Sequence, residues 1–144
     1  MEDILEILDF ELITYLAKKT RIDSRKIIDD VRHKLSRGTV SNLENRNGNI
    51  NLKTLTQYLT SLGLSKEDVL TKTKEIENEI SDLQFQLELA QILLEEKNSE
   101  EAKSILYEIQ IVDFHPLACL TKYILGKYFY EKDNFKAAKE VFLM

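Results

Sequence analysis

Apolar residues recur along this chain at the three- and four-residue spacing of amphipathic helices. The pattern predicts helices over about 3–18, 24–32, 36–45 and 51–62. β-branched residues never alternate with polar ones over the length of a strand, and the chain contains only one Pro and four Gly to interrupt helices. The fold class that these patterns predict is all-α.

Polar residues and glycines predict where several of these helices begin and end. Asp23 or Ser24 can cap the second helix, because either side chain can accept hydrogen bonds from free amides of the first turn. Asn51 is the predicted N-cap of the fourth helix and Gly63 its left-handed C-cap. The tetrapeptide Arg-Asn-Gly-Asn at 46–49 is the clearest turn signal in the chain.

Residues 65–97 contain neither Gly nor Pro. This stretch predicts either one long helix or two helices joined near residues 78–82. Ser65 and Asp68 have the spacing of a capping box at its start.

The last third of the chain repeats itself. LAQILLEEKNSEEAKSIL at 89–106 resembles LGKYFYEKDNFKAAKEVF at 125–142, at an offset of 36 residues. The matched pairs are Ala90 with Gly126, Asn98 with Asn134, Ala102 with Ala138, and Lys103 with Lys139. A self-similar helical hairpin of this length predicts a short α-solenoid.

Charge is segregated along the chain, whose formal net charge is −5. Residues 18–53 hold 10 basic and 4 acidic side chains, whereas residues 65–144 hold 10 basic and 16 acidic ones. A basic block in an acidic chain favours a polyanion-binding module joined to a second part. The alternative is that the two halves differ only in surface composition.

No residue pattern indicates an enzyme, a metal site or a cofactor. His33 and His115 are far apart in sequence, and neither has Cys or carboxylate residues at ligand spacing. Cys119 begins an apolar helix, so we predict a buried structural thiol. The single cysteine cannot form an internal disulfide and fits a reducing cytoplasm. The acidic N-terminus is no secretory signal, and no apolar run approaches the roughly 20 residues that a bilayer requires.

Residues 35–64, LSRGTVSNLENRNGNINLKTLTQYLTSLGL, carry the most specific pattern. They resemble the second half of the helix-turn-helix domain of the Cro/repressor (XRE) superfamily, in the version found in Rgg-type and PlcR-type regulators. The matching residues are Leu35-Ser36-Arg37, Val40-Ser41, Leu43-Glu44, Ile50-Asn51-Leu52 and Leu55. The chain departs from that pattern in the preceding helix, where Asp30 or Val31 replaces a small Ala and Lys34 replaces a Gly.

The repeated segment resembles the tetratricopeptide repeat, which places small residues where its two helices pack closely and large ones further along. The small positions are filled by Ala90, Gly126, Ala102 and Ala138, and the large ones by Leu93, Phe129, Leu106 and Phe142. The period of 36 exceeds the usual period of about 34. Gln86 and Lys122 stand where the family favours an apolar residue.

Together the resemblances imply a helix-turn-helix DNA-binding domain at 1–64, a helical linker at 65–82, and an incomplete array of TPR-like repeats at 83–144. They imply a sequence-specific transcriptional regulator of the bacterial cytoplasm, associated with the nucleoid when bound. Its expected partner is double-stranded DNA, and its repeats are expected to mediate homodimerisation, control by a short signalling peptide, or both. The alternative is a protein-interaction module, such as an antitoxin, anti-repressor or adaptor, that does not bind DNA.

In a helix-turn-helix the second helix lies in the major groove. Val40 and Leu43 are therefore expected to face the core, and Glu44 to pair with a basic residue such as Lys18 or Lys19. The expected base contacts are Arg37, Gly38, Thr39, Ser41 and Asn42. The expected phosphate contacts are Lys34, Ser36, Asn45, Arg46, Asn51 and Lys53. A glycine inside this helix indicates either a close approach to DNA or simple tolerance on an exposed turn.

Overall fold

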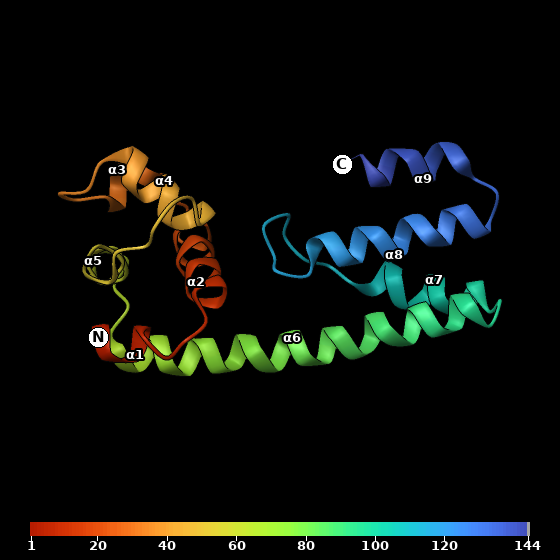
Figure 1. Cartoon of the computed structure of the whole chain (residues 1–144), viewed down its shortest axis with the longest axis horizontal. Coiled ribbons are helices and arrows are strands. Elements are labelled where there is room, and N and C mark those ends of the chain that lie inside the picture. Colours follow the sequence, from red (N-terminus) through yellow and green to blue (C-terminus); the bar gives the residue numbers. More distant parts are fainter. Residues whose placement is uncertain (144) are drawn as a thin grey trace. The chain divides into compact units, whose positions relative to one another are not determined.

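A computed structural model describes residues 1–143, which form nine helices and no strand (Figure 1). The predicted all-α class is confirmed. Contacts between residues divide the chain into two compact units, Met1–Glu77 and Asn78–Met144. None of the helices in the described part combines the length and the apolar character needed to cross a bilayer.

The first unit contains five short helices and the start of a long one. They are α1 (Glu2–Leu5), α2 (Phe10–Asp23), α3 (Ile28–Val31), α4 (Arg37–Asn45), α5 (Leu52–Ser61) and the first part of α6 (Lys66–Glu95). Helices α2 and α3 both pack against α4, and α1 packs against α5. Burial of one large apolar side chain stabilises a fold by about 1.5–3 kcal/mol. The apolar core side chains of this unit with at most 1% exposure are Leu5, Ile13, Ala17, Val31, Val40, Leu55, Tyr58, Leu59 and Val69.

The prediction of one helix over 3–18 is wrong, because the chain breaks between α1 and α2. Asp9 has extended backbone angles, and its carboxylate accepts a hydrogen bond from the Glu11 amide at 2.8 Å. A short acidic side chain that binds its own neighbouring amides favours a helix start over a helix interior. Asp9 is therefore the N-cap of α2, which then continues to Asp23.

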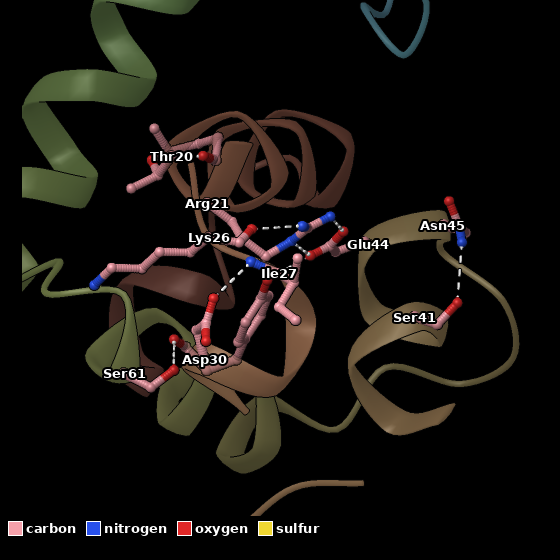
Figure 2. Close-up of polar contacts among 11 residues, drawn as sticks. Thr20, Arg21, Lys26, Ile27, Asp30, Ser41, Glu44, Asn45 and Ser61 are labelled. Carbon is pink, nitrogen blue, oxygen red and sulfur yellow. Dashed lines mark hydrogen bonds and ion pairs between the residues drawn. The ribbon is translucent and has the colours of Figure 1, made fainter. Parts of the chain in front are cut away.

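The prediction of a helix over 24–32 is also wrong in extent. Ser24 ends α2 rather than capping the next helix, and Arg25 has a left-handed backbone with φ of 56°. Helix α3 begins only after Ile27, whose amide donates to the Asp30 carboxylate at 2.9 Å (Figure 2). The segment that the pattern assigned to a full helix thus contains a single turn of helix.

The ends predicted for the third and fourth helices are confirmed. Ser36 caps α4 by accepting from the Thr39 amide at 3.0 Å, and Asn51 caps α5 by accepting from the Lys53 amide at 2.9 Å. Gly63 follows α5 with φ of 80°, the left-handed conformation that glycine adopts without steric cost. The turn between α4 and α5 is bounded by Arg46, the left-handed C-cap of α4 with φ of 55°, and by Asn51.

The stretch from residue 66 to 95 is one helix, not two. At its start the Ser65 amide donates to the Asp68 carboxylate at 2.9 Å, and the Asp68 amide donates to Ser65 Oγ at 3.1 Å. This reciprocal pair is the predicted capping box. Helix α6 contributes residues to both compact units.

The second unit contains the rest of α6, α7 (Ser99–Glu108), α8 (Ala118–Glu131) and α9 (Phe135–Phe142). Its α7–α8 and α8–α9 pairs pack together, with α6 contributing to the core (Figure 1). The buried core consists of Leu87, Ala90, Leu94, Ala102, Leu106, Leu117, Ile124 and Tyr128.

The sequence repeat is also a repeat of backbone conformation. Lys97 and Asp133, 36 positions apart, both have left-handed backbones, with φ of 63° and 56°. The Asn98 amide donates to the Leu93 carbonyl at 2.8 Å, and the equivalent bond from Asn134 to the Phe129 carbonyl is 2.9 Å. Ala90, Ala102, Gly126 and Ala138, the repeated small residues, are all buried. The helices therefore turn in the same way at both places and pack closely at the small positions.

Candidate nucleic-acid interface

Helix α4 has one buried and one exposed face. Val40, Leu43 and Glu44 are 0%, 5% and 9% exposed, as their helical spacing requires. The expected core positions Val40 and Leu43 are thus confirmed. Of the expected base contacts, Arg37, Gly38 and Asn42 are exposed, whereas Thr39 and Ser41 are half-buried at the edge of the same face. The structure brings these five residues onto one short helix.

The six expected phosphate contacts, from Lys34 to Lys53, are all exposed around this face. Ser36 and Asn51 use their side-chain oxygens as helix caps. Asn45 Nδ2 donates to Ser41 Oγ at 3.3 Å (Figure 2). Arg46 Nη1 lies 3.7 Å from a Glu11 carboxylate oxygen, an exposed pair that water screens.

A cavity of about 300 Å³ lies between α4 and the start of α5. It brings together two of the expected base contacts, Thr39 and Asn42, and one expected phosphate contact, Asn51. The remaining lining residues are Leu43, Asn47, Gly48, Asn49, Ile50 and Thr54. Six of these nine residues carry an amide or hydroxyl side chain and none is charged, so the cavity offers both hydrogen-bond donors and acceptors.

Glu44 forms a buried ion pair, but with Arg21 rather than with the expected Lys18 or Lys19. Arg21 donates from Nε and Nη2 to the two Glu44 carboxylate oxygens, each at 2.8 Å (Figure 2). Arg21 lies on the last turn of α2, because α2 continues beyond the predicted helix end at residue 18. The guanidinium fork matches both carboxylate oxygens at once, which a lysine ammonium cannot do.

The Tyr58 hydroxyl also donates to Glu44, so one carboxylate joins α2, α4 and α5. Burial, and then the hydrogen bond to the carboxylate, raise the pKa of Tyr58 well above its usual value of 10.0. The hydrogen bond to Glu44 raises the pKa of Arg21, so this guanidinium stays charged. Because the acid of α4 is neutralised inside the unit, it does not oppose a polyanion at the exposed face.

Sequence reasoning missed the partner of Arg37. Arg37 Nε donates to Asp29 Oδ1 at 2.7 Å, and Nη2 donates to Oδ2. Asp29 also accepts from Arg32 Nε at 2.9 Å. A separation of eight residues matches no helical spacing, so the sequence offered no signal for this pair. The two residues lie on α3 and α4, which pack together, and His33 in the connection has a left-handed φ of 48°.

Within residues 1–143, no group of His, Cys, Asp or Glu side chains has the arrangement of a metal site. The prediction of a buried Cys119 is wrong, because this thiol is exposed. Cys119 lies in the first turn of α8, where its apolar neighbours Leu117 and Ala118 face the core instead.

Comparisons of the chain with protein-family models, with curated proteins and with solved structures found no match.

Proposed function

We propose that this protein is a sequence-specific DNA-binding regulator that reads duplex DNA with the exposed face of α4. The observation that supports this most strongly is that α4 has a buried apolar and acidic face and an exposed polar face. Its apolar and acidic residues are buried, and its outward face presents only guanidinium, amide, hydroxyl and glycine groups. These are the groups that recognise base edges and phosphates.

The electrostatics of the first unit support the same proposal. Residues 18–53 have a net charge of +6, and the one acid within α4 is held by Arg21. A polyanion is therefore attracted to this segment before any specific contact forms. Lys34, Arg46 and Lys53 then neutralise phosphates beside the helix, and the α5 N-terminus adds its positive dipole end.

We propose that the second unit controls this binding through protein contacts, by pairing two copies of the chain or by holding a short peptide. Its support is the repeated hairpin and a large exposed apolar surface. Phe85, Leu89 and Ile92 are exposed along α6 at helical spacing, and Tyr130 and Phe135 are 61% and 56% exposed. Sedimentation with and without candidate peptides tests this part.

The DNA proposal is tested by selecting bound duplexes from a random pool and measuring affinity for the enriched site by fluorescence anisotropy. Arg37→Ala and Asn42→Ala are each expected to weaken specific binding by about 1–3 kcal/mol, the usual value of a good base contact. The matched controls are Lys136→Ala and Asn78→Ala, which remove a charge and an amide from exposed positions of the second unit. Enrichment of no sequence would contradict the proposal and favour the interaction module.

A further inference from the structure

The Arg37 side chain is 70% exposed, yet its guanidinium already has a protein partner. Asp29, from α3, holds two of its guanidinium N–H groups, on Nε and Nη2. Asp29 is itself held by Arg32, whose Nη1 donates to the Leu35 carbonyl at 3.0 Å. A chain of hydrogen bonds therefore fixes the guanidinium relative to the turn that precedes α4.

This arrangement leaves one edge of the guanidinium open. A guanidinium has five N–H groups, and the carboxylate occupies the side formed by Nε and Nη2. The three remaining N–H groups lie on Nη1 and on the outer side of Nη2. Two of them are parallel, which is the geometry that pairs with guanine O6 and N7 in the major groove.

The carboxylate also changes the charge that α4 presents. The hydrogen bond from Arg37 is the main cause that lowers the pKa of Asp29 to about 2, with Arg32 acting in the same direction. Asp29 is ionised at neutral pH and binds two arginines, so its single negative charge offsets one of their two positive charges. Because Asp29 offsets part of the Arg37 charge, Arg37 gains less from a phosphate than an unpaired arginine would, which favours base recognition over general attraction to DNA.

We propose that Asp29 is a positioning residue for base recognition: its carboxylate fixes Arg37 so that only the Nη1–Nη2 edge meets a guanine. The inference rests on the proposed DNA-binding function and adds to it a source of sequence specificity on α3. Asp29 itself contacts no base in this scheme. Asp29 acts by orienting the Arg37 guanidinium and by offsetting part of the positive charge of Arg37.

The test compares Asp29→Asn with Asp30→Asn, a matched control. Asp30 is the neighbouring acid on α3, and its carboxylate accepts from the Ile27 amide. Both variants remove one negative charge, but only the first releases Arg37. Affinities are measured for the enriched duplex and for the same duplex with its Arg37-dependent guanine replaced by adenine. That guanine is identified as the base pair at which Arg37→Ala abolishes discrimination.

The wild-type protein and Asp30→Asn are expected to prefer guanine by about 10–100-fold, the range of a good bidentate contact. Asp29→Asn is expected to reduce this preference to about threefold or less, while binding of unrelated duplex becomes tighter because Arg37 gains a free charge. A purely structural role for Asp29 would weaken both affinities and leave their ratio unchanged. Should Asp29→Asn fail to fold, Asp29→Glu tests the orientation of Arg37 alone: its longer side chain displaces the carboxylate but keeps the charge, so the guanine preference should fall while binding of unrelated duplex stays unchanged.

An unchanged guanine preference in Asp29→Asn would overturn the inference while leaving the DNA-binding proposal intact. The same holds if Arg37→Ala abolishes discrimination at no base pair. If the wild-type protein enriches no duplex, the proposed function fails and the inference fails with it. An equal loss of guanine preference in Asp30→Asn would also overturn the inference, because charge alone would then explain the effect.

Discussion

At the scale of single residues, the buried carboxylate of Glu44 shows how the one acid of α4 is kept away from the exposed face of that helix. The side chain is 3% exposed and accepts from Arg21 on α2 and from Tyr58 on α5. The sequence predicted a structural ion pair for Glu44 but not its partner. The partner depended on where α2 ends, and helix ends are set by capping contacts that the apolar pattern does not contain.

Tyr58 makes the stability of the first unit sensitive to high pH. The pKa of Tyr58 is higher in the folded protein than in the unfolded chain, where it is about 10. The contribution of Tyr58 to the free energy of unfolding is therefore complete below about pH 10 and is lost as the pH rises above that value. We expect the free energy of unfolding to fall more steeply above about pH 10 in the wild type than in Tyr58→Phe. Urea titrations across this range measure both slopes. Equal slopes in the two proteins would show that Tyr58 ionises normally.

A substitution at Gly38 can distinguish an effect on stability from an effect on the proposed DNA binding. A Cβ at this position would meet only Ser36 Oγ, at 3.9 Å, so the fold has room for a side chain. We expect Gly38→Ala to raise the free energy of unfolding by about 0.5–1 kcal/mol, because alanine loses less backbone entropy in a helix. If the α4 backbone approaches DNA at this residue, the same variant binds duplex more weakly. Greater stability with unchanged affinity would indicate simple tolerance of the glycine.

At the scale of elements, the ends of a helix could be predicted where its capping residue stands at a clear boundary of the apolar pattern. Helices α4 and α5 were predicted well because Ser36 and Asn51 cap through amides two or three residues away, at clear boundaries of the apolar pattern. Asp9 and Asp30 cap in the same local way, yet apolar residues on both sides made the sequence around them resemble helix interior. The apolar pattern reports burial, and it does not reveal where a side chain replaces a backbone hydrogen bond.

Gly126 differs from Gly38, because the close packing of α8 and α9 leaves no room for a side chain at this position. A Cβ on Gly126 would lie 2.1 Å from Cε1 of the Phe142 ring, so the ring must move away. We expect Gly126→Ala to lower the free energy of unfolding by about 1–3 kcal/mol, the usual cost of overpacking. In a Phe142→Ala background the same substitution should be neutral or slightly stabilising, because only helix propensity remains. Urea denaturation of the four proteins measures this coupling, and an identical cost in both backgrounds would contradict it.

At the scale of the whole molecule, segregated charge was the most informative feature of the sequence, because it needs no knowledge of the fold. The basic segment 18–53 lies wholly within the first compact unit, and most of the acidic part forms the second. What the sequence could not supply was the pairing of charges inside that segment. Asp29 and Glu44 cancel two of the arginines, so the cations left for phosphates are fewer than the composition suggests.

This pairing leads to a quantitative expectation for the salt dependence of DNA binding. Three exposed cations, Lys34, Arg46 and Lys53, are the proposed charged phosphate contacts, while Arg37 is held by Asp29. Each neutralised phosphate contributes about −0.9 to the slope of log affinity against log salt, so one protomer should give about −3 and a dimer on two half-sites about −5 to −6.

Fluorescence anisotropy over a series of salt concentrations measures this slope. Lys53→Gln should reduce its magnitude by about 1 for each bound protomer, whereas Lys136→Gln in the second unit should leave it unchanged. A slope much steeper than that of a dimer would mean that further basic residues of 18–53 reach phosphates. A slope near zero would contradict a backbone-contacting DNA interface, because phosphate neutralisation always releases counterions.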